Sequence, residues 1–148
     1  MCLGTDMTHN ELCIWVAAIL DGEGFLSFSI SKRNGLMTPF VGMGNTNKVL
    51  TDTFSKRCKT LGVVFGYSSD PRKGVHKNIH RVQLQNHAGI TLLLNQVEPF
   101  LIIKRMQAQL ILLFCGSRTA RGPKAPYNTV ERKAVFCTRQ LNKKGRPK

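Results

Sequence analysis

The segment Val16-Ala-Ala-Ile-Leu-Asp-Gly-Glu-Gly24 joins the first two elements expected in this chain, a helix and a strand. Before it, Thr8 is a suitable N-cap and Glu11 stands three residues later, as in a capping box, which predicts a helix from Thr8 to Leu20. After it, residues 25–32 alternate apolar and polar side chains, as a half-buried strand does. The segment therefore predicts a helix, a sharp turn at two glycines, and a strand.

Similar patterns continue along the chain. Asn34-Gly35 predicts a turn before a second strand, from Thr38 to Asn45. The elements expected after it are a helix over 47–61, strands over 63–69 and 79–85, and helices over 89–97 and 100–114. This order predicts an α+β domain of the αββαββα type, in which two hairpins form one four-stranded antiparallel sheet. Helices are then expected on one face of the sheet, which leaves the other face for a ligand.

The 148-residue chain is strongly basic, with 22 Lys and Arg against 8 Asp and Glu and a formal net charge of +14. This excess indicates a polyanionic partner, most often nucleic acid, with an anionic membrane surface as the weaker alternative. The positive charge is densest in the last part of the chain. We therefore expect a domain over 1–115 and a basic, DNA-contacting extension over 116–148, with a linker over 116–126 and a short helix over 129–141.

The cysteine content and the hydropathy of the chain indicate the cellular compartment of the protein. Five cysteines without a CxxC spacing indicate free, mostly buried thiols in a reducing compartment. Neither a signal peptide nor a membrane-spanning stretch is expected, so we predict an intracellular protein, with archaeal cytoplasm and an organelle both left open. His76 and His80 lie about 13 Å apart if that stretch is extended, so a zinc site is not expected.

The segment 16–24 resembles the LAGLIDADG signature of homing endonucleases, with Glu23 at its final acidic position, where most members carry Asp. Residues 39–47 resemble the second strand of that family and the helix start after it, and residues 97–109 resemble its "P-x-L-x-x-K-x-x-Q-A" segment. The resemblance covers about residues 8–115. It implies the family fold and an intron-encoded, site-specific double-strand DNA endonuclease, a hydrolase that needs a divalent metal and leaves short 3′ overhangs.

One copy of the motif is present, and members with one copy act as homodimers, so the resemblance implies a homodimer on a long pseudo-palindromic target. Ala18 and Gly22 are small residues four apart on one helix face, which would let two such helices pack closely. Both copies of Glu23 would then lie side by side. The alternative is that Ala18 and Gly22 pack within the monomer.

Glu23 is the predicted metal ligand, with the main-chain carbonyl of Gly22 beside it. The expected cofactor is Mg²⁺, a hard cation that takes oxygen ligands, and Mn²⁺ or Ca²⁺ would substitute for it in binding. Asp21, two residues earlier, is expected to be structural.

Two further catalytic residues are implied by the resemblance. Lys104 matches a lysine near the active site, which would stabilise negative charge or tune the attacking water. A solvated surface lysine is the alternative reading of Lys104. Asn45 matches a polar residue that orients water, and Thr46 is the neighbouring alternative.

The outward face of the sheet is the predicted DNA-reading surface, because side chains alternate along a strand. Arg and Gln suit base edges, Ser takes either role, and cations in turns contact phosphates. The predicted DNA-binding residues are Ser27, Ser29, Ser31, Arg33, Thr38, Phe40, Arg72, Lys73, Lys77, Arg81, Gln83, Arg118 and Arg121. An RNA maturase with intron RNA as its partner is the alternative on the same fold, and a basic binding protein with a chance motif is a third.

Overall fold

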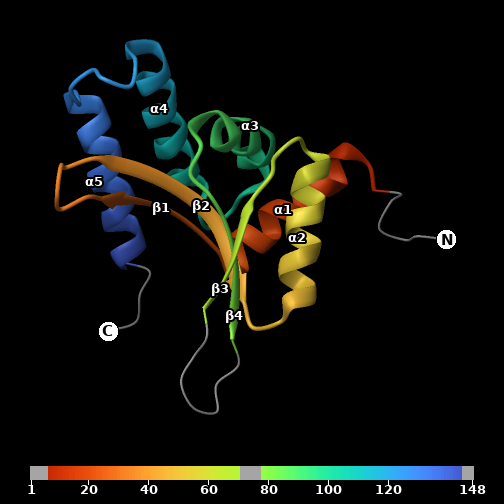
Figure 1. Cartoon of the computed structure of the whole chain (residues 1–148). Helices are drawn as coiled ribbons and strands as arrows, with labels where there is room; N and C mark the ends of the chain where they lie inside the picture. The colour runs from red at the N-terminus through yellow and green to blue at the C-terminus, as the bar shows by residue number, and fades with distance from the viewer. Residues whose placement is uncertain (1–6, 71–77, 145–148) are drawn as a thin grey trace.

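The computed structural model describes residues 7–70 and 78–144. Figure 1 shows its helices and strands. In chain order they are α1 His9–Glu23, β1 Gly24–Ile30, β2 Met37–Asn45, α2 Lys48–Thr60, β3 Gly66–Asp70, β4 Ile79–Leu84, α3 His87–Val97, the 3-10 helix η2 Glu98–Phe100, α4 Arg105–Arg121 and α5 Thr129–Lys144. None of the helices in these two ranges is long and apolar enough to cross a membrane.

The four strands form one antiparallel sheet in the order β1-β2-β4-β3. Leu26, Val41 and Leu84 lie opposite one another in its register, and all three are buried. The helices cover this apolar face, while the opposite face of the sheet lies open below it (Figure 1). The predicted α+β fold, with a four-stranded antiparallel sheet, is therefore confirmed.

Helix α1 begins as predicted and ends later than predicted. Thr8 and Glu11 form both hydrogen bonds of the capping box. The helix runs three residues beyond Leu20, because the Gly24 N–H donates to the Leu20 carbonyl and closes one more turn. Glu23 is thus the last residue of the helix and does not lie in a turn after it.

The helix expected over 100–114 is wrong at both ends. Pro99 lies in η2, and the backbone N–H groups of Ile102, Ile103 and Lys104 donate to the Asp21 carboxylate, which holds this segment outside a helix. Lys104 is therefore the N-cap of α4, where the resemblance places it inside a helix. At the other end, α4 continues past the domain boundary expected at residue 115 and into the linker expected over 116–126, and it ends at Arg121.

The last helix packs against the domain. Ala134 and Val135 of α5 are buried, and the Asn142 side chain donates to the Leu26 carbonyl of β1 at 2.9 Å. Before α5, the Tyr127 hydroxyl accepts the Met37 N–H of β2 at 2.8 Å. The C-terminal part of the chain thus braces the β1–β2 hairpin from the side of edge strand β1.

A buried carboxylate joins α4 to α5. Glu131 is fully buried and accepts hydrogen bonds from Ser117, Arg118 and Arg121 at 2.6, 3.2 and 2.8 Å. The Asn128 N–H adds a fourth hydrogen bond. This network fixes the angle between the two helices.

Smaller differences concern ends of elements. The third strand begins at Gly66, and Val63 and Phe65, which were expected inside it, are buried in the segment before it. Helix α3 begins two residues earlier than predicted, because Asn86 caps it through the Gly89 N–H. Of the four cysteines in the described residues, all have free thiols and all but Cys137 are buried, as predicted.

Candidate active site and nucleic-acid interface

Glu23 lies exposed at the C-terminal end of α1, beside the last residue of β2. Its Oε2 atom accepts a hydrogen bond from the Asn45 amide at 3.1 Å. The Asn45 amide oxygen in turn accepts the Asn47 N–H at 2.8 Å, and Asn47 caps α2 by accepting the Val49 N–H at 3.0 Å. The carboxylate is therefore positioned by an amide that the strand end and the α2 cap both hold in place.

The electrostatics at this helix end are unusual. Asp21 and Glu23 stand at the negative end of the helix dipole, and the last turn has no basic residue of its own. Lys104 supplies the missing cation, since its ammonium donates to the carbonyls of Leu20 and Asp21 at 3.0 and 2.7 Å. Burial lowers the pKa of Lys104, against the opposing effect of the Asp21 and Glu23 carboxylates. Lys104 is half-buried at the site, so the reading of it as a solvated surface lysine is wrong.

The residues at this end of α1 fit a hard divalent cation. Within the described ranges, no three His, Cys, Asp or Glu side chains group together as a metal site. Glu23 nevertheless presents an exposed carboxylate where the helix dipole already favours a cation. The Lys104 ammonium is hydrogen-bonded to the carbonyls of Leu20 and Asp21. The next main-chain oxygen that a cation could bind is therefore the Gly22 carbonyl. This donor set consists of oxygens, as Mg²⁺ prefers.

The two small residues of α1 face outward. Ala18 and Gly22 are exposed, and a Cβ atom on Gly22 would meet nothing within 4 Å. Ile14, one turn before Ala18, is 49% exposed, and Ile103, which the Asp21 carboxylate holds against the end of α1, is 71% exposed. Packing of Ala18 and Gly22 within the monomer is therefore wrong, and α1 presents an uncovered face of small and apolar residues.

The open face of the sheet carries the predicted reading residues. Ser27 lies opposite Phe40, and Ser29 lies opposite Thr38. On the next strand pair, Gln83 lies opposite Gly42 and Arg81 lies opposite Gly44. The register thus places Ser27, Ser29, Thr38, Phe40, Arg81 and Gln83 on one face.

Phe25 is a residue of this face that the sequence reasoning missed. Its ring packs 5.6 Å from that of Phe40, and it lies over Gly42, where an added Cβ would come within 2.8 Å of the Phe25 ring. The same alternation that selected Ser27 and Ser29 places Phe25 outward. Phe25 and Phe40 together form an aromatic platform on an otherwise polar surface.

Other predicted contacts lie elsewhere. Strand β1 ends at Ile30, so Ser31 and Arg33 belong to the turn that follows and not to the strand face. The guanidinium of Arg118 is buried against Glu131 and the Pro123 carbonyl, so we no longer expect it to contact DNA. Arg121 also binds Glu131 but stays one-third exposed. Arg72, Lys73 and Lys77 lie outside the described residues.

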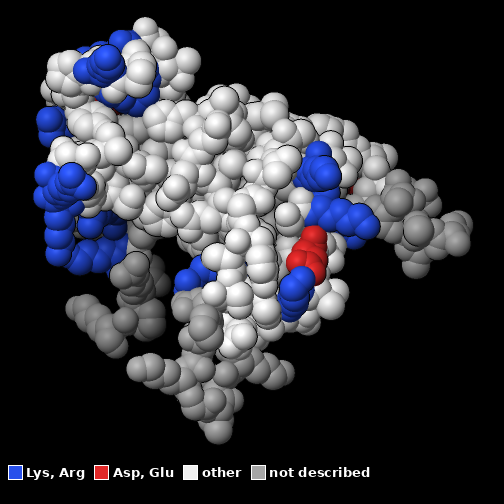
Figure 2. Space-filling model, in the orientation of Figure 1, with Lys and Arg blue, Asp and Glu red and all other residues white. Residues whose placement is uncertain are grey.

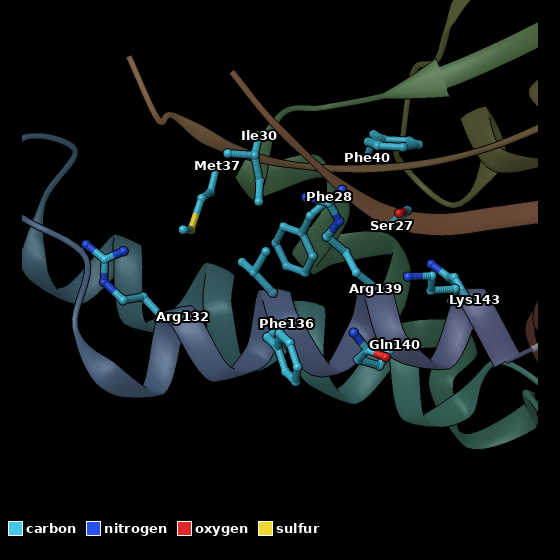
Figure 3. A pocket seen from close by; sticks show the side chains of 12 residues that line it. Ser27, Phe28, Ile30, Met37, Phe40, Arg132, Phe136, Arg139, Gln140 and Lys143 are labelled. Carbon is cyan, nitrogen blue, oxygen red and sulfur yellow. The ribbon is translucent and has the colours of Figure 1, made fainter. Parts of the chain in front are cut away.

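A groove of about 620 Å³ separates α5 from the β1–β2 hairpin. Figure 3 shows the hairpin on one side, with Ile30 and Met37, and α5 on the other, with Arg132, Arg139 and Lys143 along its length. Lys and Arg also gather over α5 on the left of the molecular surface (Figure 2). The sequence reasoning missed these three cations, although a helical projection of residues 129–144 places them apart from the buried Ala134 and Thr138.

No protein-family model matches the chain, and no curated protein sequence matches it either. Solved structures do match its fold. The homing endonuclease I-CvuI, in complex with an I-CreI target in the presence of Mg, has a TM-score of 0.66 at 17% identity, over 95% of this chain and 86% of that one. The archaeal intron-encoded homing endonuclease I-Vdi141I, complexed with DNA, has a TM-score of 0.51 at 12% identity, over 86% and 94% of the two chains.

A longer protein matches over part of its length. The LAGLIDADG meganuclease I-AabMI, bound to uncleaved DNA, has a TM-score of 0.62 at 14% identity, and the match covers 86% of this chain and 43% of that one. The chain therefore has the fold of the LAGLIDADG homing endonucleases.

Proposed function

We propose that the protein is a site-specific double-strand DNA endonuclease that acts as a homodimer and needs a divalent metal. One observation carries the proposal: the exposed Glu23 carboxylate, held by Asn45 and flanked by Lys104, lies at the end of a helix whose Ala18–Gly22 face is uncovered. The Glu23 carboxylate, the Asn45 amide and the Lys104 ammonium have complementary chemistry, and they come together where a phosphate and a cation would bind.

The uncovered face of α1 supports the proposed homodimer. Two copies of α1 that pack through Ala18 and Gly22 would bring two Glu23 carboxylates together at a two-fold axis. The lengths of the matching proteins support a pair of such domains. I-CvuI is matched over 86% of its length, whereas I-AabMI is matched over only 43%, so the I-AabMI chain has room for a second domain of this kind.

Each residue of the site has a distinct task. Glu23, with the Gly22 carbonyl, would hold Mg²⁺, which when bound supplies an activated water and neutralises charge on the phosphate. Asn45 orients the Glu23 carboxylate and the water beside it. Lys104 keeps a positive charge at the end of α1, where it stabilises the negative charge that builds up on the phosphate oxygens.

DNA would lie along the open face of the sheet. Ser27, Ser29, Arg81 and Gln83 present hydrogen-bonding groups of the kinds that read base edges in the major groove. A dimer would repeat this surface about its two-fold axis, which suits a long pseudo-palindromic target cut on both strands. Arg132, Arg139 and Lys143 on α5 would contact phosphates beside the sheet.

The experiment begins with selection of bound duplexes from a randomised library in Ca²⁺. The selected duplex is then incubated with Mg²⁺ and the wild-type protein, Glu23→Gln, or Asp52→Asn, which alters an exposed carboxylate on α2. We expect the wild type and Asp52→Asn to cut both strands, and Glu23→Gln to bind without cutting. Normal cutting by Glu23→Gln would refute the site, and tight binding of structured intron RNA without any duplex cleavage would favour the maturase alternative.

A further inference from the structure

A second polar pair, Tyr67 and His80, lies on the same face of the sheet as Asn45. The Tyr67 hydroxyl is 2.6 Å from His80 Nδ1, and the two rings are 15° from parallel. In the register of the sheet, His80 lies directly opposite Asn45 on one side, while Tyr67 comes from β3 on the other. Directly opposed side chains on neighbouring strands lie in contact range. Asn45 on β2, His80 on β4 and Tyr67 on β3 therefore follow one another across the sheet, with Glu23 of α1 hydrogen-bonded to Asn45.

The contact with Tyr67 engages one of the two ring nitrogens of His80. Nδ1 and Nε2 lie on different edges of an imidazole ring. Because Nδ1 contacts Tyr67 on β3, Nε2 is the His80 nitrogen that can serve a group at the strand end where Asn45 lies.

The same contact bears on the tautomer of the neutral ring. When the Tyr67 hydroxyl donates, Nδ1 accepts and the ring hydrogen lies on Nε2. Both partners are held in place: the Lys48 ammonium lies 5.4 Å from the centre of the Tyr67 ring, and the buried Thr51 hydroxyl donates to the His80 carbonyl at 3.4 Å. With the hydrogen on Nε2, His80 carries an N–H donor on the strand next to Asn45.

We propose that His80 is a positioning residue of the proposed nuclease site, with Tyr67 holding its ring. Its Nε2–H donates to the water molecules that Asn45 and Glu23 orient at the phosphate. The proposal rests on the proposed function, since it assigns a further residue to that same site.

Three variants test it by single-turnover cleavage of the selected duplex. Glutamine places its amide nitrogen near the position of Nε2, whereas asparagine places its amide nitrogen near Nδ1. We expect His80→Asn to slow cleavage on the order of tenfold or more, as the loss of one positioned donor does, and His80→Gln to restore most of the rate. Tyr67→Phe, which frees the ring, should have an intermediate rate. Duplex affinity in Ca²⁺ and melting temperature serve as controls and should stay close to wild type.

A measurement without DNA or metal separates this proposal from the proposed function. Long-range ¹H–¹⁵N spectra of the free protein, assigned with His80→Asn, should show the Nε2–H tautomer for His80 and a mixture of tautomers in Tyr67→Phe. An Nδ1–H tautomer in the wild type, or cleavage by His80→Asn at the wild-type rate, would overturn the role of His80. A wild-type protein that cuts no selected duplex while His80 keeps its Nε2–H tautomer would overturn the proposed function instead.

Discussion

Asp21 and Lys104 bind each other twice: the Asp21 carboxylate accepts the Lys104 N–H at 2.9 Å, and the Lys104 ammonium donates to the Asp21 carbonyl at 2.7 Å. The side chain of each residue thus forms a hydrogen bond with the backbone of the other. This reciprocal pair locks the start of α4 to the end of α1, which positions both Lys104 and Glu23.

We expect Asp21→Asn to destabilise the fold by about 2 kcal/mol, because the amide nitrogen would face backbone N–H donors that now bind a charged acceptor. Urea unfolding measures the loss. Asp52→Asn is the control, since the exposed Lys48–Asp52 pair should contribute under about 1 kcal/mol. Equal effects of the two substitutions would mean that the Asp21 contacts add nothing to stability.

Ala18→Glu should break the proposed homodimer, because two carboxylates would face each other across the two-fold axis. Sedimentation velocity should then show a monomer, and cleavage should be lost with it. Ala120→Glu is the matched control, an exposed alanine near the end of α4. If Ala18→Glu sediments like the wild type, the dimer does not form through this face of α1.

Acid should destabilise the α4–α5 junction through Glu131. Burial alone would raise the pKa of Glu131, but hydrogen bonds from Ser117, Asn128, Arg121 and Arg118 outweigh it and lower the pKa from 4.5 to about 2. Because the pKa of Glu131 is lower in the folded state, the ionised Glu131 carboxylate stabilises the fold above pH 4.5, and this stabilisation is lost as pH falls toward 2. At neutral pH it corresponds to about 3 kcal/mol.

Glu131→Gln tests this directly by urea unfolding over a series of pH values. The difference in unfolding free energy between the wild type and Glu131→Gln should be greatest near neutral pH and should shrink as pH falls below 4.5. A difference that stays constant over that range would contradict the assigned role of Glu131.

Arg139→Gln should weaken duplex binding and reduce its salt dependence, because it removes one proposed phosphate contact from the groove between α5 and the β1–β2 hairpin. The slope of log affinity against log salt should fall by about 0.9 for each subunit. Lys59→Gln, an exposed lysine on α2, is the control. An identical slope change in both variants would show that Arg139 contributes only to the net charge.

Local patterns decided much of the architecture in advance. The capping box at Thr8, the alternation after Gly24 and the turn at Asn34-Gly35 are short-range signals, and the structure contains each of these elements. Alternation also separates the two faces of a strand without any tertiary information, because successive side chains point in opposite directions. The predicted reading face on β1, β2 and β4 therefore agrees with the register of the sheet.

Contacts between residues far apart in the chain decided the rest. The late start of α4 depends on Asp21, more than 80 residues earlier, and the burial of Arg118 depends on Glu131 in the next helix. The same holds for His80, whose sequence neighbours say nothing of Tyr67 or Asn45. Short-range patterns in the chain thus predicted the order of the elements, the two faces of the strands and the acid near the end of α1. Which charges are satisfied internally and which stay at the site depends on partners that local patterns do not specify, so it became known from the folded structure.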